Sequence, residues 1–244
     1  MGMDAGGQVS RAFLGRLGLI PYEQAMALEA GLCQLRYEER LPDTVLLMEH
    51  PSVVTLGRFG SPDHVLVPPA ELARRGIAFV RSNRGGEVTF HALGQLVLHA
   101  VMDLRCRKGA LRGFITDLEE VALRALASYG VAAERWEEHP GLWVKGRQIG
   151  AIGLHVSHGI SSHGLAINVD PDLASFGVVN LCGLPGREAT SIARELGRRV
   201  DVKRTYHILA AAFAEVFQVK LATVTKAYLS KLVAESSVSK TVLP

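Results

Sequence analysis

The strongest candidate for covalent chemistry in this sequence is a cysteine in a segment that also contains glycine and proline. Cys182 stands in the segment VVNLCGLPG, residues 178–186. Glycine and proline indicate a loop rather than the interior of a strand or helix. A cysteine on a loop of a protein from a reducing compartment is a candidate nucleophile, although a structural thiol is the alternative. A sulfur nucleophile beside a shaped pocket suits acyl transfer between thioesters.

A second stretch, RGGEVTFH at residues 84–91, brings together a cation, a glycine pair and an imidazole. Gly85-Gly86 allows a tight turn and lets the backbone approach a ligand closely. The glycine spacing matches neither GxGxxG nor a Walker loop, so a nucleotide phosphate cradle is not indicated. In a strand, Thr89 and His91 would point to the same face. A hairpin turn with a solvated arginine and a structural histidine is the simpler interpretation.

A third stretch, residues 148–169, reads as strands interrupted by glycine. Gly150 and Gly153 weaken the strand pattern and favour the close approach of a ligand or of another backbone segment. A bulge or tight packing explains the same two glycines. The turn Lys145-Gly146-Arg147 predicts a hairpin just before this stretch.

Hydrophobic periodicity places the second and third stretches on a sheet with helices around it, and the loop with Cys182 follows the last predicted strand. It predicts helices at 22–40, 69–75, 111–129, 172–176, 189–196 and 204–217, and strands at 44–49, 53–56, 77–81, 88–91, 95–104, 142–144, 148–156 and 162–169. Strands and helices mix without strict βαβ alternation, which predicts an α+β fold around a mixed β-sheet. We expect one catalytic domain at 11–220, with flexible ends at 1–10 and 235–244.

Composition excludes several classes of protein. The chain has 244 residues, of which 48% are hydrophobic and 21% charged, so a folded core is expected. The net charge of +3 is too mild to indicate nucleic acid, and no apolar run approaches the ~18 residues of a membrane span. Three scattered cysteines, Cys33, Cys106 and Cys182, show no zinc spacing and fit a cytoplasmic protein without a metal. Cys33 lies beside a helical apolar stripe and is predicted to be a core thiol.

Together these stretches resemble one family, the octanoyl-carrier-protein:protein octanoyltransferases, or lipoyl(octanoyl) transferases, of lipoate biosynthesis. The resemblance covers residues 11–200 and rests on an ordered set of motifs, which is far more specific than any one of them. The motifs are HPSVVTLG (50–57), RGGEVTFHALGQ (84–95), PGLWV (140–144), IGAIGL (149–154), SHGLAINVD (162–170) and CG (182–183).

The resemblance implies the fold of biotin and lipoate protein ligases and an acyltransferase that needs no cofactor. Such an enzyme takes octanoyl from octanoyl-acyl carrier protein and delivers it to a lysine of lipoyl domains, those of 2-oxoacid dehydrogenases and of the glycine cleavage H protein. Cys182 would carry the acyl group as a thioester. The implied acyl and pantetheine pocket is lined by Arg84, Gly85, Gly86, Glu87, Val88, Thr89, Phe90, His91, Ala151, Ile152, Gly153, Gly164, Leu165 and Ala166.

Two positions depart from the family pattern. Leu181 stands where proline usually precedes the cysteine, and Gln148 stands where the family has a lysine that lowers the pKa of the cysteine. An amide donates a hydrogen bond but carries no charge and cannot act as a base. An unassisted thiol with a pKa of ~8.5 is only a few per cent thiolate at pH 7.

Another residue could take over the role of that lysine. His91 and His163 are candidate bases. Lys145 is a third, although three strand residues span ~10 Å and the hairpin turn would hold it away. Two other functions stay open: an ATP-dependent lipoate or biotin ligase of the same fold, for which the sequence shows no phosphate-binding loop, and a non-catalytic relic that binds an acyl group or its carrier.

Overall fold

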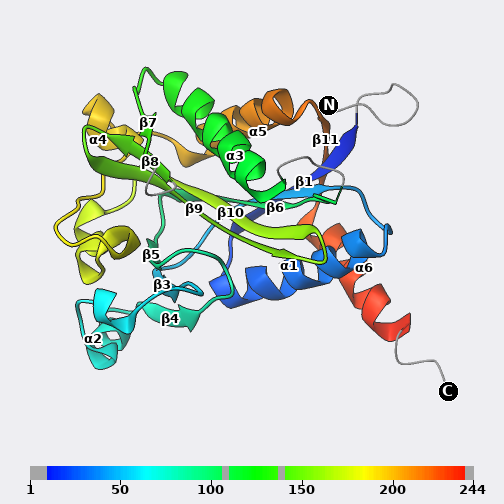
Figure 1. Cartoon of the computed structure of the whole chain (residues 1–244), viewed down its shortest axis with the longest axis horizontal. Helices are drawn as coiled ribbons and strands as arrows, with labels where there is room; N and C mark the ends of the chain where they lie inside the picture. Colours follow the sequence, from blue (N-terminus) through cyan, green and yellow to red (C-terminus); the bar gives the residue numbers. More distant parts are fainter. Residues whose placement is uncertain (1–9, 106–109, 137–140, 240–244) are drawn as a thin grey trace.

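The computed structural model describes residues 10–105, 110–136 and 141–239 (Figure 1). The expectations for residues 1–9, Cys106 and residues 240–244 lie outside these ranges. One large sheet runs through the molecule, with helices on both of its faces and a smaller sheet at one end. Among the described residues, no helix is both long enough and apolar enough to cross a membrane.

The large sheet has eight strands in the order β11-β1-β2-β6-β10-β9-β8-β7. Their bounds are β1 Arg11–Leu19, β2 Thr44–Glu49, β6 Gln95–Val101, β7 Glu134–Arg135, β8 Gly141–Val144, β9 Arg147–Ser157, β10 Ile160–Asn168 and β11 Lys220–Val224. β1 is parallel to both of its neighbours, and the other neighbouring pairs are antiparallel. This mixed sheet confirms the predicted α+β class.

Four helices bury the two faces of this sheet (Figure 1). One face carries α3 (Ala110–Ala127) and α5 (Val202–Phe217), and the other carries α1 (Tyr22–Tyr37) and α6 (Lys226–Ser239). Successive residues of a strand point to opposite faces, so Leu165 packs under α3 and α5 while Ala166 packs under α1. Because both faces are covered, every residue of β10 is buried, including the polar residues Ser161, Ser162, His163 and Asn168.

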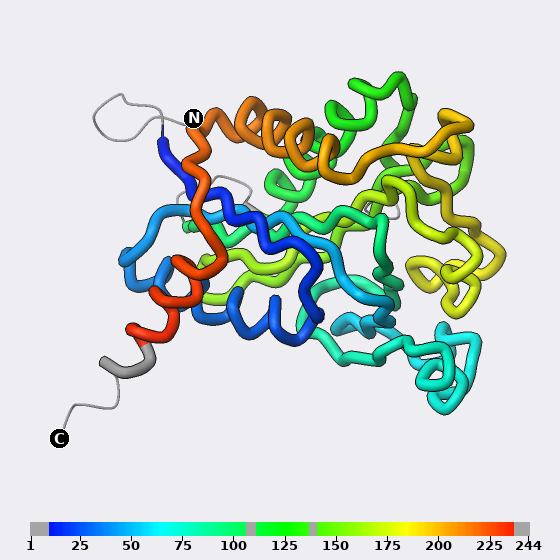
Figure 2. Tube along the Cα trace, turned by 180° about the vertical axis from the view of Figure 1, so that it is seen from behind, coloured from blue at the N-terminus to red at the C-terminus, as the bar shows by residue number. Residues whose placement is uncertain are grey.

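The small sheet carries the RGGEVTFH stretch. Its strands are β4 (Ala78–Arg81), β3 (Val53–Leu56) and β5 (Val88–His91), in the order β4-β3-β5. It shares a separate core with α2 (Pro69–Arg74) and with the short 3₁₀ turns that precede and contain Cys182. Those turns are η2 (Leu173–Val178) and η3 (Leu181–Gly183). A further 3₁₀ turn, η1 (Pro62–His64), lies beside them, and the helix α4 (Ile192–Leu196) follows them in the sequence. Chain segments far apart in the sequence therefore meet at this end, as Figure 2 shows from behind.

Four strands and helices were not predicted from the sequence, namely β1, β7, β11 and α6. β1 was not predicted because Gly15 and Gly18 interrupt its strand pattern. In the structure, the pairing of β1 with β2 shifts register between Arg16 and Gly18. β11 and α6 follow residue 220, and both pack against β1. α6 continues to Ser239, and the expectation of a flexible end at 235–244 stays a prediction.

Candidate active site

The backbone of η3 holds Cys182 in an uncommon conformation. Cys182 has φ 52° and ψ 28°, in the left-handed region that few residues other than glycine adopt. Leu181 is buried in the small-sheet core and anchors one side of the turn. The N–H of Gly183 donates to the carbonyl of Asn180 over 3.0 Å and closes the turn. Such strain persists only where its surroundings impose it, and it is concentrated at functional sites.

The side chain of Gln148 reaches the sulfur. Its Nε2 donates a hydrogen bond to Cys182 Sγ over 2.9 Å. The backbone of Gln148 is fixed on both sides, because its N–H donates to Glu188 O and its carbonyl accepts from the Thr190 N–H. Residue 148, at which the family resemblance predicts a lysine, is therefore held in contact with this cysteine.

Arg84 is buried rather than solvated, which contradicts the simpler interpretation of its stretch. Its Nε and Nη2 donate to Thr55 Oγ1 over 3.0 and 2.8 Å, and Nη2 also donates to the Thr55 carbonyl over 2.7 Å. A fourth contact, from Nη1 to the Gly85 carbonyl, spans 3.1 Å. Thr55 of β3 thus fixes the guanidinium in the interior, where its charge acts on the sulfur.

The balance of charges leaves the sulfur as a thiol. Burial raises the pKa of Cys182, and the hydrogen bond from Gln148 and the positive charge of Arg84 lower it. The carboxylate of Glu87 raises it further, and the net shift is upward from the ordinary value. The site therefore favours the neutral thiol at neutral pH, and both groups that stabilise the thiolate are outweighed.

A cavity of about 300 Å³ opens beside Cys182. Leu111 and Ile115 of α3 and the exposed Phe59 complete its apolar wall. Besides Cys182, the predicted pocket residues that line it are Arg84, Gly85, Gly86, Glu87, Thr89, Ala151, Ile152 and Gly153. The two glycine stretches approach each other directly, because the Gly85 N–H donates to the Leu154 carbonyl over 2.7 Å.

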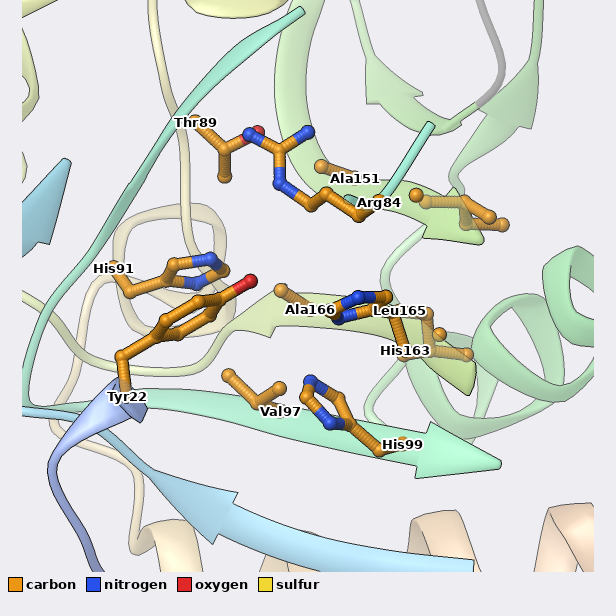
Figure 3. A pocket seen from close by; sticks show the side chains of 13 residues that line it. Tyr22, Arg84, Thr89, His91, Val97, His99, Ala151, His163, Leu165 and Ala166 are labelled. Atoms are coloured by element: carbon orange, nitrogen blue, oxygen red, sulfur yellow. The ribbon is translucent and has the colours of Figure 1, made fainter. Parts of the chain in front are cut away.

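A second, smaller cavity of about 30 Å³ lies deeper (Figure 3). It shares Arg84, Thr89 and residues 151–153 with the first cavity, so the two are neighbours along one wall. His91, Gly164, Leu165 and Ala166 line only this deeper space. Figure 3 shows Tyr22 and His91 stacked at one side, with their ring centroids 5.7 Å apart.

Val88 and Phe90 were predicted to line the pocket, and the structure contradicts this. Both side chains are buried in the core of the small sheet and line neither cavity. The reason is the period of a strand: Thr89 and His91 face the cavities, so the residues on either side of Thr89 must face away.

The three candidate bases lie away from the sulfur, and none of them lines the cavity of Cys182 within the described ranges. Lys145 occupies the β8–β9 turn at φ 49°. His91 is held by Gln95 Oε1 at 2.6 Å, and burial lowers the pKa of its imidazole well below the ordinary value. His163 contacts Asn83 Oδ1 at 2.7 Å, on the far side of the deeper cavity.

His64 is a residue that the sequence did not single out. A Cβ added at Gly183 would lie 3.3 Å from His64 Nε2, which places this imidazole next to the turn that contains Cys182. The His64 carbonyl accepts from the Asn180 N–H over 2.8 Å, and Val65 forms a bridge with Val179. No motif links these two segments, so only the fold brings them together.

The fold is that of lipoate-protein ligases. A bi-partite lipoate protein ligase from Thermoplasma acidophilum superposes with a TM-score of 0.73, at 17% identity, over 93% of this chain and 91% of that one. A lipoate-protein ligase A bound with ATP gives 0.72, at 18% identity, over 93% of each chain. At these identities the likeness establishes the fold alone.

Proteins related in sequence identify the family within this fold. Residues 21–214 match the lipoyl protein ligase A/B catalytic domain. The octanoyltransferase of Chloroflexus aurantiacus is 44% identical over 204 residues, which is 82% of this chain and 92% of that protein. The octanoyltransferase of Maridesulfovibrio salexigens is 37% identical over 201 residues, with 82% and 94% covered. The chain belongs to the lipoyl protein ligase A/B catalytic domain family, as its motifs predicted, and it is an acyltransferase.

Proposed function

We propose that this protein transfers an octanoyl group from octanoyl-acyl carrier protein to a lysine of lipoyl domains through an acyl thioester on Cys182. The observation that carries the proposal is the Gln148–Cys182 hydrogen bond at the mouth of a partly apolar cavity. The relatives named octanoyltransferase support the choice of acyl group. The acceptors are lipoyl domains of 2-oxoacid dehydrogenases and of the glycine cleavage H protein, and a reduced Cys182 fits a cytoplasmic enzyme.

The reaction is a double displacement. The Cys182 thiolate attacks the carbonyl carbon of the donor thioester, the bond to the carrier's pantetheine sulfur breaks, and that thiolate takes up a proton. The amine of the target lysine then attacks the new thioester, loses a proton and forms an amide, while Cys182 leaves as thiolate. The donor thioester already carries the activation, so the exchange needs neither ATP nor an oxidant.

The two steps make different demands on the site. In the first, Gln148 can stabilise the thiolate through its N–H but cannot remove the thiol proton. In the second, a group near the turn must accept a proton from the lysine amine. We assign this role to His64, because its Nε2 lies beside Gly183. An imidazole is suited to proton transfer near neutral pH.

Intact-mass measurement tests the proposal. The protein is incubated with octanoyl-carrier protein, and apo lipoyl domain is added afterwards. We expect a shift of one octanoyl group that disappears when the lipoyl domain is added. Cys182→Ala should abolish the shift, and Cys33→Ala, which removes the other free thiol of the described residues, should keep it. An adduct on Cys182→Ala would refute the thioester assignment.

Three further arms separate the alternatives. Acyl transfer that requires ATP would favour the ligase reaction. An adduct that forms and is never passed on would indicate a binding relic. His64→Gln should slow the loss of the adduct to the lipoyl domain without slowing its formation, and equal effects on both steps would remove His64 from the role of base.

A further inference from the structure

Behind the deeper cavity, one carboxylate and two imidazoles converge in the interior. Glu29 of α1, His99 of β6 and His163 of β10 are all buried, with side chains 3–4% exposed. One ligand atom from each lies within 4.8 Å of the others. Glu29 Oε1 is 3.2 Å from His99 Nδ1, and Glu29 Oε2 is 3.7 Å from His163 Nδ1. Figure 3 shows the two imidazoles at one wall of that cavity.

Both of these ring nitrogens are buried and lack a hydrogen bond within the described part of the chain. On His163 the opposite nitrogen, Nε2, lies 2.7 Å from Asn83 Oδ1. An amide oxygen only accepts, so we place the ring proton on Nε2. The lone pair of the buried Nδ1 then faces the Glu29 carboxylate. Two electron-rich groups that face each other in the interior are stabilised by a cation between them.

The backbone is bent to bring these groups together. His163 adopts φ 59° inside β10, in the left-handed region. Its N–H donates to Glu29 Oε1 over 2.7 Å, which ties the strand to α1. Strain of this kind in the middle of a strand is a mark of a functional position. No element of the proposed acyl transfer uses it.

We propose that Glu29, His99 and His163 bind one divalent transition-metal ion of the zinc class. Two imidazole nitrogens and one carboxylate oxygen are a ligand set that Zn²⁺ accepts, at 2.0–2.2 Å, with a fourth position left for water. A metal-bound imidazole usually donates its other N–H to an oxygen, and Asn83 supplies that oxygen for His163.

The ion has a route to this site. A cavity of about 350 Å³ between α1 and the β9–β10 hairpin is lined by Glu29, Asn83 and His163, with exposed Tyr37 and His158 at its rim. Cys182 lies in a different cavity, so the metal is not placed to act on the sulfur. Its role is structural: it ties α1 to β6 and β10 and fixes the wall formed by His99 and His163. The sequence did not predict this metal site because its ligands come from three separate elements.

Metal binding by the whole, untagged protein tests the site directly. The protein is stripped with a chelator, and Zn²⁺ is then titrated against a chromophoric competitor while the Tm is followed. We expect one equivalent per chain and a rise in Tm, since a ligand that binds only the folded state stabilises it. Co²⁺ should give the visible absorption of a low-symmetry nitrogen and oxygen site. A stripped protein that takes up neither ion, with an unmoved Tm, overturns the proposal whatever any variant does.

Variants locate the ion. Glu29→Gln and His163→Gln should weaken Zn²⁺ binding by more than the ~10–100-fold that Asn83→Ala, which removes only the outer partner, should cost. His155 lines the same entry cavity but lies outside the cluster, so His155→Gln is the matched control and should keep the wild-type affinity. Equal affinity in Glu29→Gln and His155→Gln would show that the metal binds elsewhere and would overturn the assignment.

Discussion

Gln148 Nε2 donates a hydrogen bond to Cys182 Sγ over 2.9 Å. This contact joins the proposed nucleophile to the position at which the family resemblance predicts a lysine. The donor is close enough to stabilise a thiolate on Cys182, but the amide of Gln148 carries no positive charge. A neutral donor stabilises a thiolate only weakly, whereas an ammonium at the same place favours it strongly. Burial and Glu87 therefore prevail, and the pKa of Cys182 stays above its ordinary value.

Replacing this amide by an ammonium should activate the thiol. Gln148→Lys is expected to lower the pKa of Cys182 and to raise its rate of alkylation and acylation near neutral pH. Each pKa unit corresponds to ~1.4 kcal/mol of differential stabilisation. The kinetic gain is smaller, because a less basic thiolate is also a poorer nucleophile. The measurement is the pH dependence of alkylation followed by intact mass.

Gln148→Met is the matched control for that substitution. It keeps the length of the side chain and removes the donor, so the pKa of Cys182 should rise above that of the wild type. If the thiol of the wild type already titrates well below pH 8 and Gln148→Lys leaves its pKa unchanged, another group performs the role of the lysine, and Gln148 does not limit the ionisation of Cys182.

In the wild type, the Cys182 thiol should ionise only above the pH at which an ordinary cysteine does. Burial raises the pKa of Cys182, and a thiol reacts as its thiolate, so the fraction that reacts grows as pH rises toward that pKa. The alkylation rate of Cys182 should therefore keep rising beyond pH ~8.5, the ordinary thiol value, without a plateau at neutral pH. Cys182→Ala supplies the background from other thiols. A plateau below pH 8 would contradict the raised pKa.

Glu87 should make the Cys182 thiol less reactive at neutral pH. It lines the cavity of Cys182, and its negative charge raises the pKa of the thiol. Its Oε2 accepts a hydrogen bond from the Ser61 N–H over 3.1 Å, and Glu87→Gln keeps an oxygen for this contact. The substitution should lower the pKa of Cys182 and quicken alkylation at pH 7. Glu39→Gln, which removes an exposed carboxylate outside that cavity, should leave the rate unchanged. A slower reaction in Glu87→Gln would instead assign the carboxylate as a base.

Local patterns predicted most strands and helices because each has a clear period of its own. The same period placed Thr89 and His91 on one face of β5, and it could have excluded Val88 and Phe90 from the pocket had the strand been known to cover a second core. Contacts between distant segments were out of reach. Nothing in the sequence couples His64 to Gly183, or Glu29 to the two histidines, because those approaches depend on strand order and on α1 lying across the sheet.

The close approach of strands at the deeper cavity gives a prediction about stability. A Cβ added at Gly164 of β10 would overlap the carbonyl oxygen of Leu98 in β6, where the backbone cannot give way easily. Gly164→Ala should therefore destabilise the protein by about 1–3 kcal/mol, the usual cost of overpacking. Urea unfolding of the metal-free protein should show a lower midpoint with an unchanged slope. Gly177→Ala is the control, since a Cβ there meets nothing within 4 Å and the change should stay within ~0.5 kcal/mol. If both variants unfold at the same urea concentration, β10 and β6 are not in the tight contact that leaves room for only a hydrogen atom at residue 164.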